Sequence, residues 1–360
     1  MNARENLLSL YRKSGYKYAP VTFSLCPSLQ EEYRRRAGDT PMPEYFDYPE
    51  GFAAEGIPGP KVIRSHVDWN RYYAGGVKEG TSFDIWGVAH EPGSADAKHM
   101  TRMRHPLASA TSLEEIQAYP YPSFDTSNMA AMKAAVESVH EAGKAAIGHM
   151  ACTIWETAWA IRSMPQLMMD MMLEDPKAIF LLDKITELSC IRARAYAEAG
   201  VDIIHLGDDI GMQQAIMMSV EMYRTWLKPR LKRVIDAAKS VKPDVLIFYH
   251  SCGFVKPLID DLIEAGVEIL NPVQPECMDF AEIHAMYSDR LSFNGTLGTQ
   301  TTMPFGTPDE VRETVFRNLE TAGERGGLVC CPTHLLEPEV PWENIEAYVN
   351  ACKEFSLAGS

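Results

Sequence analysis

From about residue 125 onward, the sequence alternates between expected helices and short apolar runs, and this alternation constrains the fold more than any other feature. The expected helices cover 127–142, 178–199, 220–240, 255–265 and 308–323. The apolar runs cover 145–148, 201–206, 245–249, 267–270, 291–293 and 327–330. Because repeated strand–helix units with short connections build parallel sheets, this order favours an α/β fold of the closed (β/α)₈ TIM-barrel type. An open doubly wound sheet is the alternative, although no G-x-G-x-x-G or P-loop follows any strand.

The whole chain, 1–360, is expected to form a single barrel domain with an elaborated N-terminal region. Regular βα units are expected over 121–360, and an N-terminal extension with lid-like segments over 1–120. A helix is expected over residues 2–14 and a short strand over 20–24. The stretch that follows is rich in Pro, Gly and aromatic residues and has no sustained hydrophobic period.

Composition excludes several classes of protein. The net charge of -15 argues against a general nucleic-acid binder, which needs a basic face. No apolar stretch reaches the roughly 18 residues of a membrane span, and the N-terminus leads into an amphipathic helix rather than a signal peptide. Eight cysteines without the spacing of a secreted disulfide framework favour reduced thiols and a cytoplasmic protein.

Polar side chains follow each of the six apolar runs. In a barrel, the residues just past the strands define the active-site face, so these side chains are expected to converge. In chain order they are His149, Asp208, Asp209, His250, Cys252, Asn271, Gln274, Asn294, Cys330, Cys331 and His334. Any one of them is uninformative by itself, because loops after strands are polar in general. Their convergence predicts a functional site.

The triplet His250-Ser251-Cys252 is the strongest candidate within that group. On extended backbone, side chains two residues apart share a face, so an imidazole and a thiolate can reach one ion, and zinc accepts both. A catalytic zinc needs about three protein ligands, and Cys331 and His334 are the candidates for the third. The alternatives are a buried His and Cys that bind no metal, and core thiols at Cys330 and Cys331.

The chain resembles the uroporphyrinogen decarboxylase superfamily and, within it, the corrinoid-dependent zinc methyltransferase branch, including the methyltransferases of O-demethylase systems. The matching segments are 207–211 (Gly-Asp-Asp-Ile-Gly), 250–253 (His-Ser-Cys-Gly), 266–274, 293–300 and 341–345 (Pro-Trp-Glu-Asn-Ile). The resemblance is dense from about 200 to 350. It implies that Asp84 lies near the position of the decarboxylases' catalytic aspartate.

The resemblance favours methyl transfer over decarboxylation. The decarboxylases open with an Arg-rich motif that holds porphyrinogen carboxylates, whereas residues 16–24 here read Tyr-Lys-Tyr-Ala-Pro-Val-Thr-Phe-Ser. In the zinc methyltransferases, the third ligand is a Cys shortly before a Pro-x-Glu-Asn segment. Counting back nine residues from Glu343 places that position at His334, with Cys331 as the alternative. A site with a single thiolate is more Lewis acidic, which favours an ether oxygen as its ligand.

The function expected from these features is methyl transfer from a methoxylated aromatic compound to the cobalt of a corrinoid. The chain lacks the Asp-x-His-x-x-Gly cobalamin motif, so the corrinoid is expected on a partner protein. The aromatic residues of the 45–86 stretch, with Trp155 and Trp159, are expected to form an apolar wall for the ring. Two alternatives are methyl transfer from methylcobalamin to a thiol, as in coenzyme M methylation, and a metal-free decarboxylase-like activity.

Roles for the remaining polar residues follow from this mechanism. Glu156, Asp208 and Asp209, together with Asp84, are the candidate catalytic carboxylates, able to protonate the leaving oxygen or complete the zinc coordination. For Asp208 and Asp209, a hydrogen-bonding role at the strand end is the alternative. Cofactor contacts are expected from Asn271, Gln274 and Asn294.

Overall fold

Six parallel strands form the central sheet of the molecule. The structure, a computed structural model, describes residues 1–50, 57–64, 66–93 and 101–355. Neighbouring strands follow sequence order, and each pair is parallel. The strands are β6 (Ile147–Ala151), β7 (Ile203–Gly207), β8 (Leu246–His250), β9 (Ile269–Asn271), β10 (Ser292–Asn294) and β11 (Leu328–Val329). The expected parallel α/β architecture is confirmed, and every apolar run assigned as a strand overlaps one of these six.

Two extended segments of the N-terminal region complete the barrel. Leu25, in the first segment, forms a parallel bridge to Leu336, and Glu50, in the second, forms one to Ala145 at the β6 edge. The hydroxyl of Tyr48 links the two segments by donating a 2.7 Å hydrogen bond to a backbone carbonyl of the first. Six regular strands and two irregular segments therefore fill the eight strand positions. The strand expected over 20–24 is not formed: these residues have no strand pairing, and the segment's one bridge is at Leu25.

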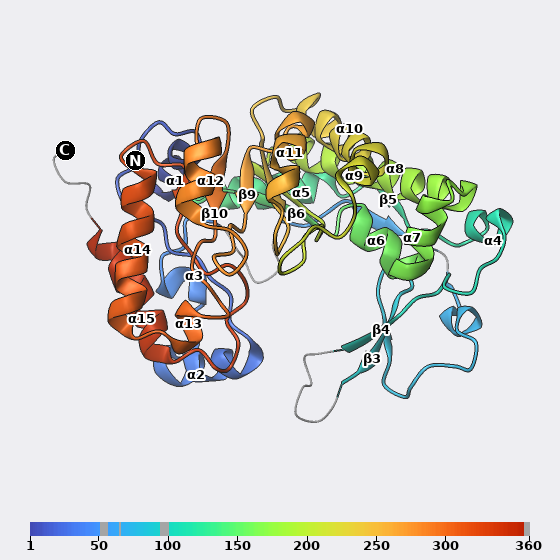
Figure 1. The fold of residues 1–360 in the computed structure, drawn as a ribbon, viewed down its shortest axis with the longest axis horizontal. Helices are drawn as coiled ribbons and strands as arrows, with labels where there is room; N and C mark the ends of the chain where they lie inside the picture. The colour runs from blue at the N-terminus through green and yellow to red at the C-terminus, as the bar shows by residue number, and fades with distance from the viewer. Residues whose placement is uncertain (51–56, 65, 94–100, 356–360) are drawn as a thin grey trace.

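Helices follow the strands and cover the barrel (Figure 1). In the βα part of the chain they are α5 (Met129–Glu141), α6 (Trp155–Arg162), α7 (Met164–Met172), α8 (Pro176–Ala199), α9 (Val220–Trp226), α10 (Lys228–Lys239), η2 (Lys256–Leu258), α11 (Ile259–Ala265), α12 (Phe280–Tyr287), α13 (Thr302–Phe305), α14 (Pro308–Ala322) and α15 (Trp342–Glu354). Helix α8 packs against α5 and α10, and α14 packs against α15. The Asp175 side chain caps the start of α8, and Gly200, at φ 95°, ends it in the left-handed conformation.

One expected helix, over 220–240, is divided into α9 and α10. Pro229 follows the break and lacks a backbone N–H, so it cannot continue the hydrogen-bond ladder of α9, and the chain reorients at Leu227. Beyond the break, Val234, Ile235 and Ala238 share one buried face at helical spacing. Hydrophobic periodicity alone does not register such a break, because the apolar pattern continues through it.

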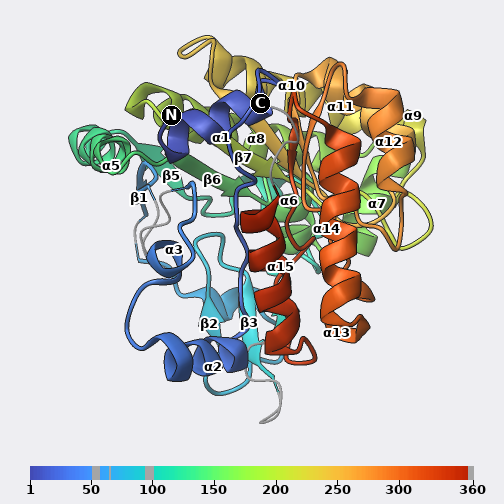
Figure 2. The same cartoon turned by 90° about the vertical axis from the view of Figure 1, so that its left-hand side faces the viewer.

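The N-terminal region adds short elements around the barrel. They are α1 (Ala3–Tyr11), α2 (Pro27–Ala37), α3 (Met42–Tyr45), β1 (Lys61–Ile63), η1 (Trp69–Tyr72), β2 (Ser82–Phe83), β3 (Ala89–Pro92), β4 (Thr101–Arg104), α4 (Leu113–Gln117) and β5 (Ser123–Asp125). Strands β2, β3 and β4 form an antiparallel sheet, and β1 pairs with β5. Both views place α2 and this antiparallel sheet on the side of the molecule opposite α10 (Figures 1 and 2). Phe52, part of the aromatic-rich stretch, lies outside the described residues.

Within the described ranges, no helix combines the length and the apolar composition that a membrane crossing requires. All eight cysteines are free thiols.

A buried carboxylate, Asp202, joins helix α1 to the barrel. It is 3% exposed and receives hydrogen bonds from the Arg4 guanidinium at 2.7 Å and from the backbone N–H of Ala146 at 2.9 Å. His140 of α5 lies 2.9 Å from the same carboxylate. Burial opposes ionisation, but these hydrogen bonds and the positive charge of Arg4 lower the pKa of Asp202 below its usual value. Asp202 therefore holds α1, α5 and the start of β7 together.

Replacing Asp202 by Asn is expected to destabilise the fold. The variant Asp202→Asn keeps the shape but leaves Arg4 without its counter-charge, which costs about 2 kcal/mol of the free energy of unfolding once the partial exposure of Arg4 is allowed for. Since the pKa of Asp202 is lowered by folding, its contribution is present above the pKa of the unfolded carboxyl and is lost as the pH falls. Urea unfolding at pH 7 measures the change.

Asp244→Asn is the matched control, because Asp244 is exposed and pairs only with surface cations. Its loss is expected to cost less than about 0.5 kcal/mol. Equal unfolding midpoints for the two variants would contradict the role assigned to Asp202.

Candidate metal centre

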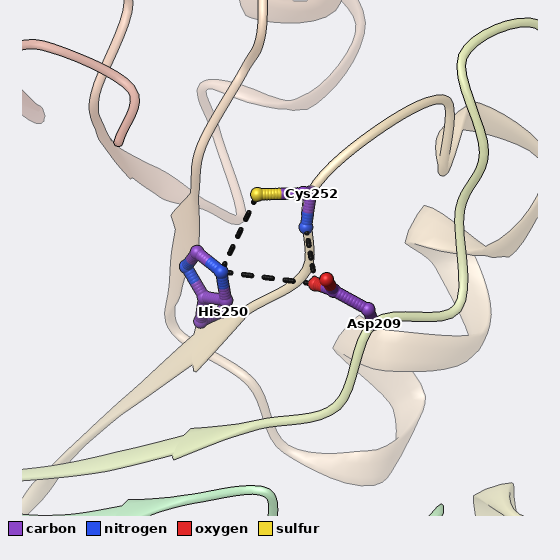
Figure 3. A group of neighbouring side chains, drawn as sticks. All are labelled: Asp209, His250 and Cys252. Carbon is purple, nitrogen blue, oxygen red and sulfur yellow. Dashed lines mark hydrogen bonds and ion pairs between the residues drawn. The ribbon is translucent and has the colours of Figure 1, made fainter. Parts of the chain in front are cut away.

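Three potential metal donors meet at the C-terminal ends of β7 and β8. Asp209 follows β7, His250 ends β8, and Cys252 lies two residues further on (Figure 3). Their donor atoms all lie within 4.8 Å of one another. His250 Nε2 is 3.5 Å from Cys252 Sγ and 3.7 Å from Asp209 Oδ1. One soft thiol, one imidazole and one carboxylate are a donor set that zinc accepts, so the residues present fit that ion.

Two glycines allow these loops to approach so closely. A Cβ added to Gly207 would lie 2.8 Å from the Cβ of His250, and one added to Gly211 would lie 2.6 Å from the carbonyl oxygen of Cys252. Neither separation is sterically possible without displacing backbone. Asp209 Oδ1 then accepts a 2.8 Å hydrogen bond from the Cys252 N–H, which fixes the β7 loop against the β8 loop. The Gly-Asp-Asp-Ile-Gly segment thus packs directly against the H-x-C triplet and is hydrogen-bonded to it.

Asn271, at the end of β9, selects the tautomer of His250. The Asn271 amide N–H₂ donates to the backbone carbonyl of Asn294 at 3.0 Å, and a carbonyl can only accept. The other end of the amide, Oδ1, therefore faces His250 Nδ1 at 2.5 Å and accepts a hydrogen bond from its N–H. This leaves the lone pair of His250 on Nε2, the nitrogen that faces Cys252 and Asp209. Such a fixed tautomer is what metal-binding histidines require.

The network continues behind Asn271, away from the three donors. The Asn271 amide also donates to the Asn294 side chain at 2.8 Å, and Asn294 donates to the Tyr11 hydroxyl at 2.8 Å. Cys331 donates its thiol to Asn294 Oδ1 at 3.3 Å. Burial raises the pKa of Cys331 well above its usual value, so this thiol is protonated. Of the predicted residues, Asn271 and Asn294 thus hold His250 in position. Cys331 contacts Asn294 and is not part of the group formed by Asp209, His250 and Cys252.

The two other carboxylates of this region have different surroundings. Asp208 is 3% exposed and accepts hydrogen bonds from the backbone N–H groups of Ile154 at 3.0 Å and Glu156 at 2.9 Å, so it caps the start of α6. Burial raises its pKa well above the usual value. Glu156 accepts a 3.1 Å hydrogen bond from the Asp209 N–H, and burial followed by repulsion from Asp209 raises the pKa of Glu156. Glu156 therefore neighbours the three donors, whereas Asp208 holds the backbone around them.

His334 approaches the donors from the loop after β11. Its ring centre lies 6.4 Å from that of His250, and its side chain lines both the barrel cavity and a smaller groove that contains Cys252. Burial, followed by the charge of His250, lowers the pKa of His334, so its imidazole is neutral and able to bind a metal. Gln274 lines the groove and accepts a 3.1 Å hydrogen bond from the Gly253 N–H, which positions the loop after Cys252.

Asp84 is not brought to this group of residues. Its carboxylate accepts hydrogen bonds from the N–H groups of Trp86 at 2.8 Å and Val88 at 3.0 Å in the turn between β2 and β3. His90 lies 3.4 Å from its other oxygen. Asp84 is absent from the described lining of the barrel cavity, and its contacts are those of a turn residue.

A cavity of about 900 Å³ is lined by residues of the barrel strands, His250 among them. His149, His205 and His250, from β6, β7 and β8, all line it, with ring centres 5.4 and 6.3 Å apart along the row. Burial, followed by the charges of the two neighbouring histidines, lowers the pKa of His205 well below its usual value. Residues of α2 and α3 border the cavity, whereas Trp155 and Trp159, expected to form an aromatic wall, do not line it.

Two cavity residues, Glu50 and His205, were missed in the sequence. His205 lies directly opposite His149 in the β6–β7 register, and strand alternation from His149 could have found it. Glu50 belongs to an irregular barrel segment with no hydrophobic period, so the sequence carries no signal that places it inside the barrel.

Comparison with known proteins supplies the family. The model of the uroporphyrinogen decarboxylase (URO-D) family matches residues 89–355, which include the six parallel strands together with β3 and β4. The chain belongs to the uroporphyrinogen decarboxylase family. The same fold is found in a solved methyltransferase from Methanosarcina mazei, which aligns over 99% of both chains with a TM-score of 0.63 and 21% identity.

Curated relatives include both methyltransferases and decarboxylases. The methylcobamide:CoM methyltransferase MtaA of Methanosarcina barkeri is 30% identical over 175 residues, 48% of each protein. A uroporphyrinogen decarboxylase of Chlorobium limicola is 28% identical over 192 residues, 52% of each. The chain therefore spans about half the length of the curated relatives it matches.

Removing either residue of the H-x-C triplet is expected to abolish zinc binding. Cys252→Ala and His250→Ala each delete a donor and leave too few to hold the ion. Zinc content per chain after dialysis against a weak chelator measures the loss. Cys190→Ala is the matched control, because this half-buried cysteine of α8 donates only to the Arg233 carbonyl. Stoichiometric zinc in Cys252→Ala would refute the site.

The same measurement identifies the third donor. Asp209→Asn and His334→Ala each remove one candidate for the third ligand, and the variant that loses zinc marks the ligand. Cys331→Ala is expected to keep its zinc, because its thiol contacts Asn294 and not the donors.

Asn271→Leu is expected to weaken zinc binding about 10- to 100-fold, because His250 loses the acceptor that fixes its tautomer. Competition with a chromophoric chelator measures the affinity. Asn271→Asp restores an acceptor at the same position and is expected to bind zinc more tightly than the Leu variant. Wild-type affinity in Asn271→Leu would show that the hydrogen bond does not position His250.

Proposed function

We propose that this protein is a zinc-dependent methyltransferase that moves a methyl group from a corrinoid to a small thiol. The observation that carries the proposal is the group of Asp209, His250 and Cys252, with the His250 lone pair directed at the other two by Asn271. The sequence similarity to a methylcobamide:CoM methyltransferase supports methyl transfer over decarboxylation as the function. A thiol acceptor, our alternative from the sequence, is accordingly preferred to the methoxylated aromatic donor.

His250 and Cys252 are proposed as two zinc ligands, with Asp209 or His334 as the third. Zinc held there would act as a Lewis acid that keeps a bound substrate thiol in its reactive thiolate form at neutral pH. Burial, with repulsion from Asp209 and Glu156, raises the pKa of Cys252 to about 12, so this thiol loses its proton only when a cation is near.

In the proposed reaction, the substrate sulfur attacks the methyl carbon, a carbon–sulfur bond forms, and the carbon–cobalt bond of the methyl-corrinoid breaks with both electrons left on cobalt. The chain's contribution is to orient the sulfur and accept its proton. The carboxyl of Glu156, hydrogen-bonded to the Asp209 backbone, is proposed to take that proton, since burial has raised its pKa. The corrinoid is proposed to arrive on a separate partner protein that docks over the strand ends.

A second candidate is demethylation of a methoxylated compound. The observation that favours it is a donor set with a single thiolate, because His or Asp as the third ligand gives a more Lewis-acidic ion than a second cysteine does. In that direction the leaving oxygen, and not a sulfur, would need stabilisation. Glu156 would then donate a proton instead of accepting one.

The zinc-loaded protein is expected to demethylate methylcobalamin when a small thiol is added, measured as the loss of methylcobalamin absorbance and the appearance of the methyl thioether. Cys252→Ala is expected to lower the rate by more than about 100-fold, because it disrupts the zinc site. Cys190→Ala should retain the wild-type rate. Activity that needs no thiol, or methylcobalamin formed from cobalt(I) cobalamin and methoxyarenes alone, would exclude the thiol reading.

A further inference from the structure

The barrel cavity contains a buried carboxylate that the proposed methyl transfer does not use. Glu50 is 6% exposed and lines the cavity from the irregular segment beside β6. Among the described residues, its side chain accepts no hydrogen bond and forms no ion pair. A buried carboxylate is costly unless it is paired, so Glu50 calls for a partner that the described residues do not provide.

The groups around Glu50 cannot compensate its charge. Burial first, and the charge of Glu50 after it, raise the pKa values of Tyr11, Tyr48 and Cys331, so these neighbours are neutral. Burial raises the pKa of Glu50 to about 7, and no nearby cation lowers it. The carboxyl is therefore held in an environment that favours the arrival of a positive charge.

The rest of the described cavity wall also lacks buried positive charge. Arg34 is the one Lys or Arg among the described lining residues, and it is exposed in α2 at the rim. Asp39, also at the rim, adds a second carboxylate. Burial lowers the pKa of His149, so this imidazole is neutral at pH 7. A sulfonate or carboxylate ligand would find no buried Lys or Arg among the described lining residues to form a charge-assisted hydrogen bond.

Aromatic rings supply the remaining recognition chemistry. Phe23, Tyr48 and Phe248 all line the cavity, and the ring centres of Phe23 and Tyr48 lie 5.6 Å apart. Alkyl groups on a positively charged nitrogen pack well against aromatic rings, through burial of apolar surface and attraction to the ring face. A carboxylate beside such rings is a wall suited to an alkylammonium group.

We propose that the barrel cavity binds a small molecule carrying an alkylammonium group, with Glu50 as its counter-ion. That this molecule is also the methyl-transfer substrate rests on the proposed function; that the cavity binds it does not. A cavity with this preference would not suit an anionic methyl acceptor, such as a thiol that carries a sulfonate group. A substrate with an ammonium group at one end and a methyl-accepting or methyl-donating atom at the other would reach from Glu50 toward His250, which lines the same cavity.

Calorimetric titration of the metal-free protein with two ligands of equal shape tests the proposal. Choline carries a trimethylammonium group, and 3,3-dimethylbutan-1-ol has the same shape with carbon in place of nitrogen. Choline is expected to bind at least about tenfold more tightly, because its positive charge can neutralise Glu50 and the neutral alcohol cannot. Glu50→Gln is expected to weaken choline about tenfold and to change the neutral ligand less than about threefold. Glu31→Gln is the matched control and should leave both affinities unchanged, because Glu31 is exposed on α2 and does not line the cavity.

Equal binding of choline and its neutral counterpart to the wild-type protein would overturn the proposal without any variant being made. Unchanged choline affinity in Glu50→Gln would overturn it as well, and so would stronger binding of 2-mercaptoethanesulfonate than of choline. The titration needs no zinc and no corrinoid, so its outcome is independent of the methyl-transfer assay. A protein that binds choline but never demethylates methylcobalamin would refute the proposed function alone.

Discussion

The hydrogen bond between His250 Nδ1 and Asn271 Oδ1 is the interaction on which the rest of the site depends. It is possible only because β8 and β9 pair in parallel with His250 opposite Asn271. Its direction is fixed one strand further on, where the Asn294 carbonyl accepts from the same amide. Three adjacent strand ends therefore decide which nitrogen of one imidazole can bind a metal. A shift of one residue in either register would point these side chains to the other face of the sheet.

The barrel of this uroporphyrinogen decarboxylase family member contains two neighbouring features, a candidate metal site and a cavity. At the strand ends, donor atoms converge on a point suited to a divalent ion; the cavity presents Glu50 and aromatic rings. Both regions attract positive charge, and the net charge of -15 reinforces the attraction at long range. Charge in the cavity, more than the barrel itself, sets what such a protein can bind.

Much of the fold could be predicted from the sequence, because regular strands and helices leave a period in the hydrophobic pattern. The six parallel strands were located this way, and strand ends gave His250, Cys252 and Asp209 as neighbours. The two irregular segments of the barrel leave no such period, and Glu50 was missed with them. Spacing along the chain also cannot show whether a thiol faces a candidate metal site or an amide. The contact between Cys331 and the Asn294 side chain could therefore not be predicted. The same holds for Asp84, whose turn contacts are local.

The contacts at Gly207 and Gly211 have a consequence for how this site can change. Because the β7 and β8 loops touch where a side chain would not fit, neither loop can be lengthened, shortened or exchanged without the other. Variation in a relative should therefore appear as paired changes in both loops or in neither. Among the described residues, the irregular segment that carries Glu50 makes no such contact with Asp209, His250 or Cys252, so this part of the cavity wall can vary independently of those three side chains.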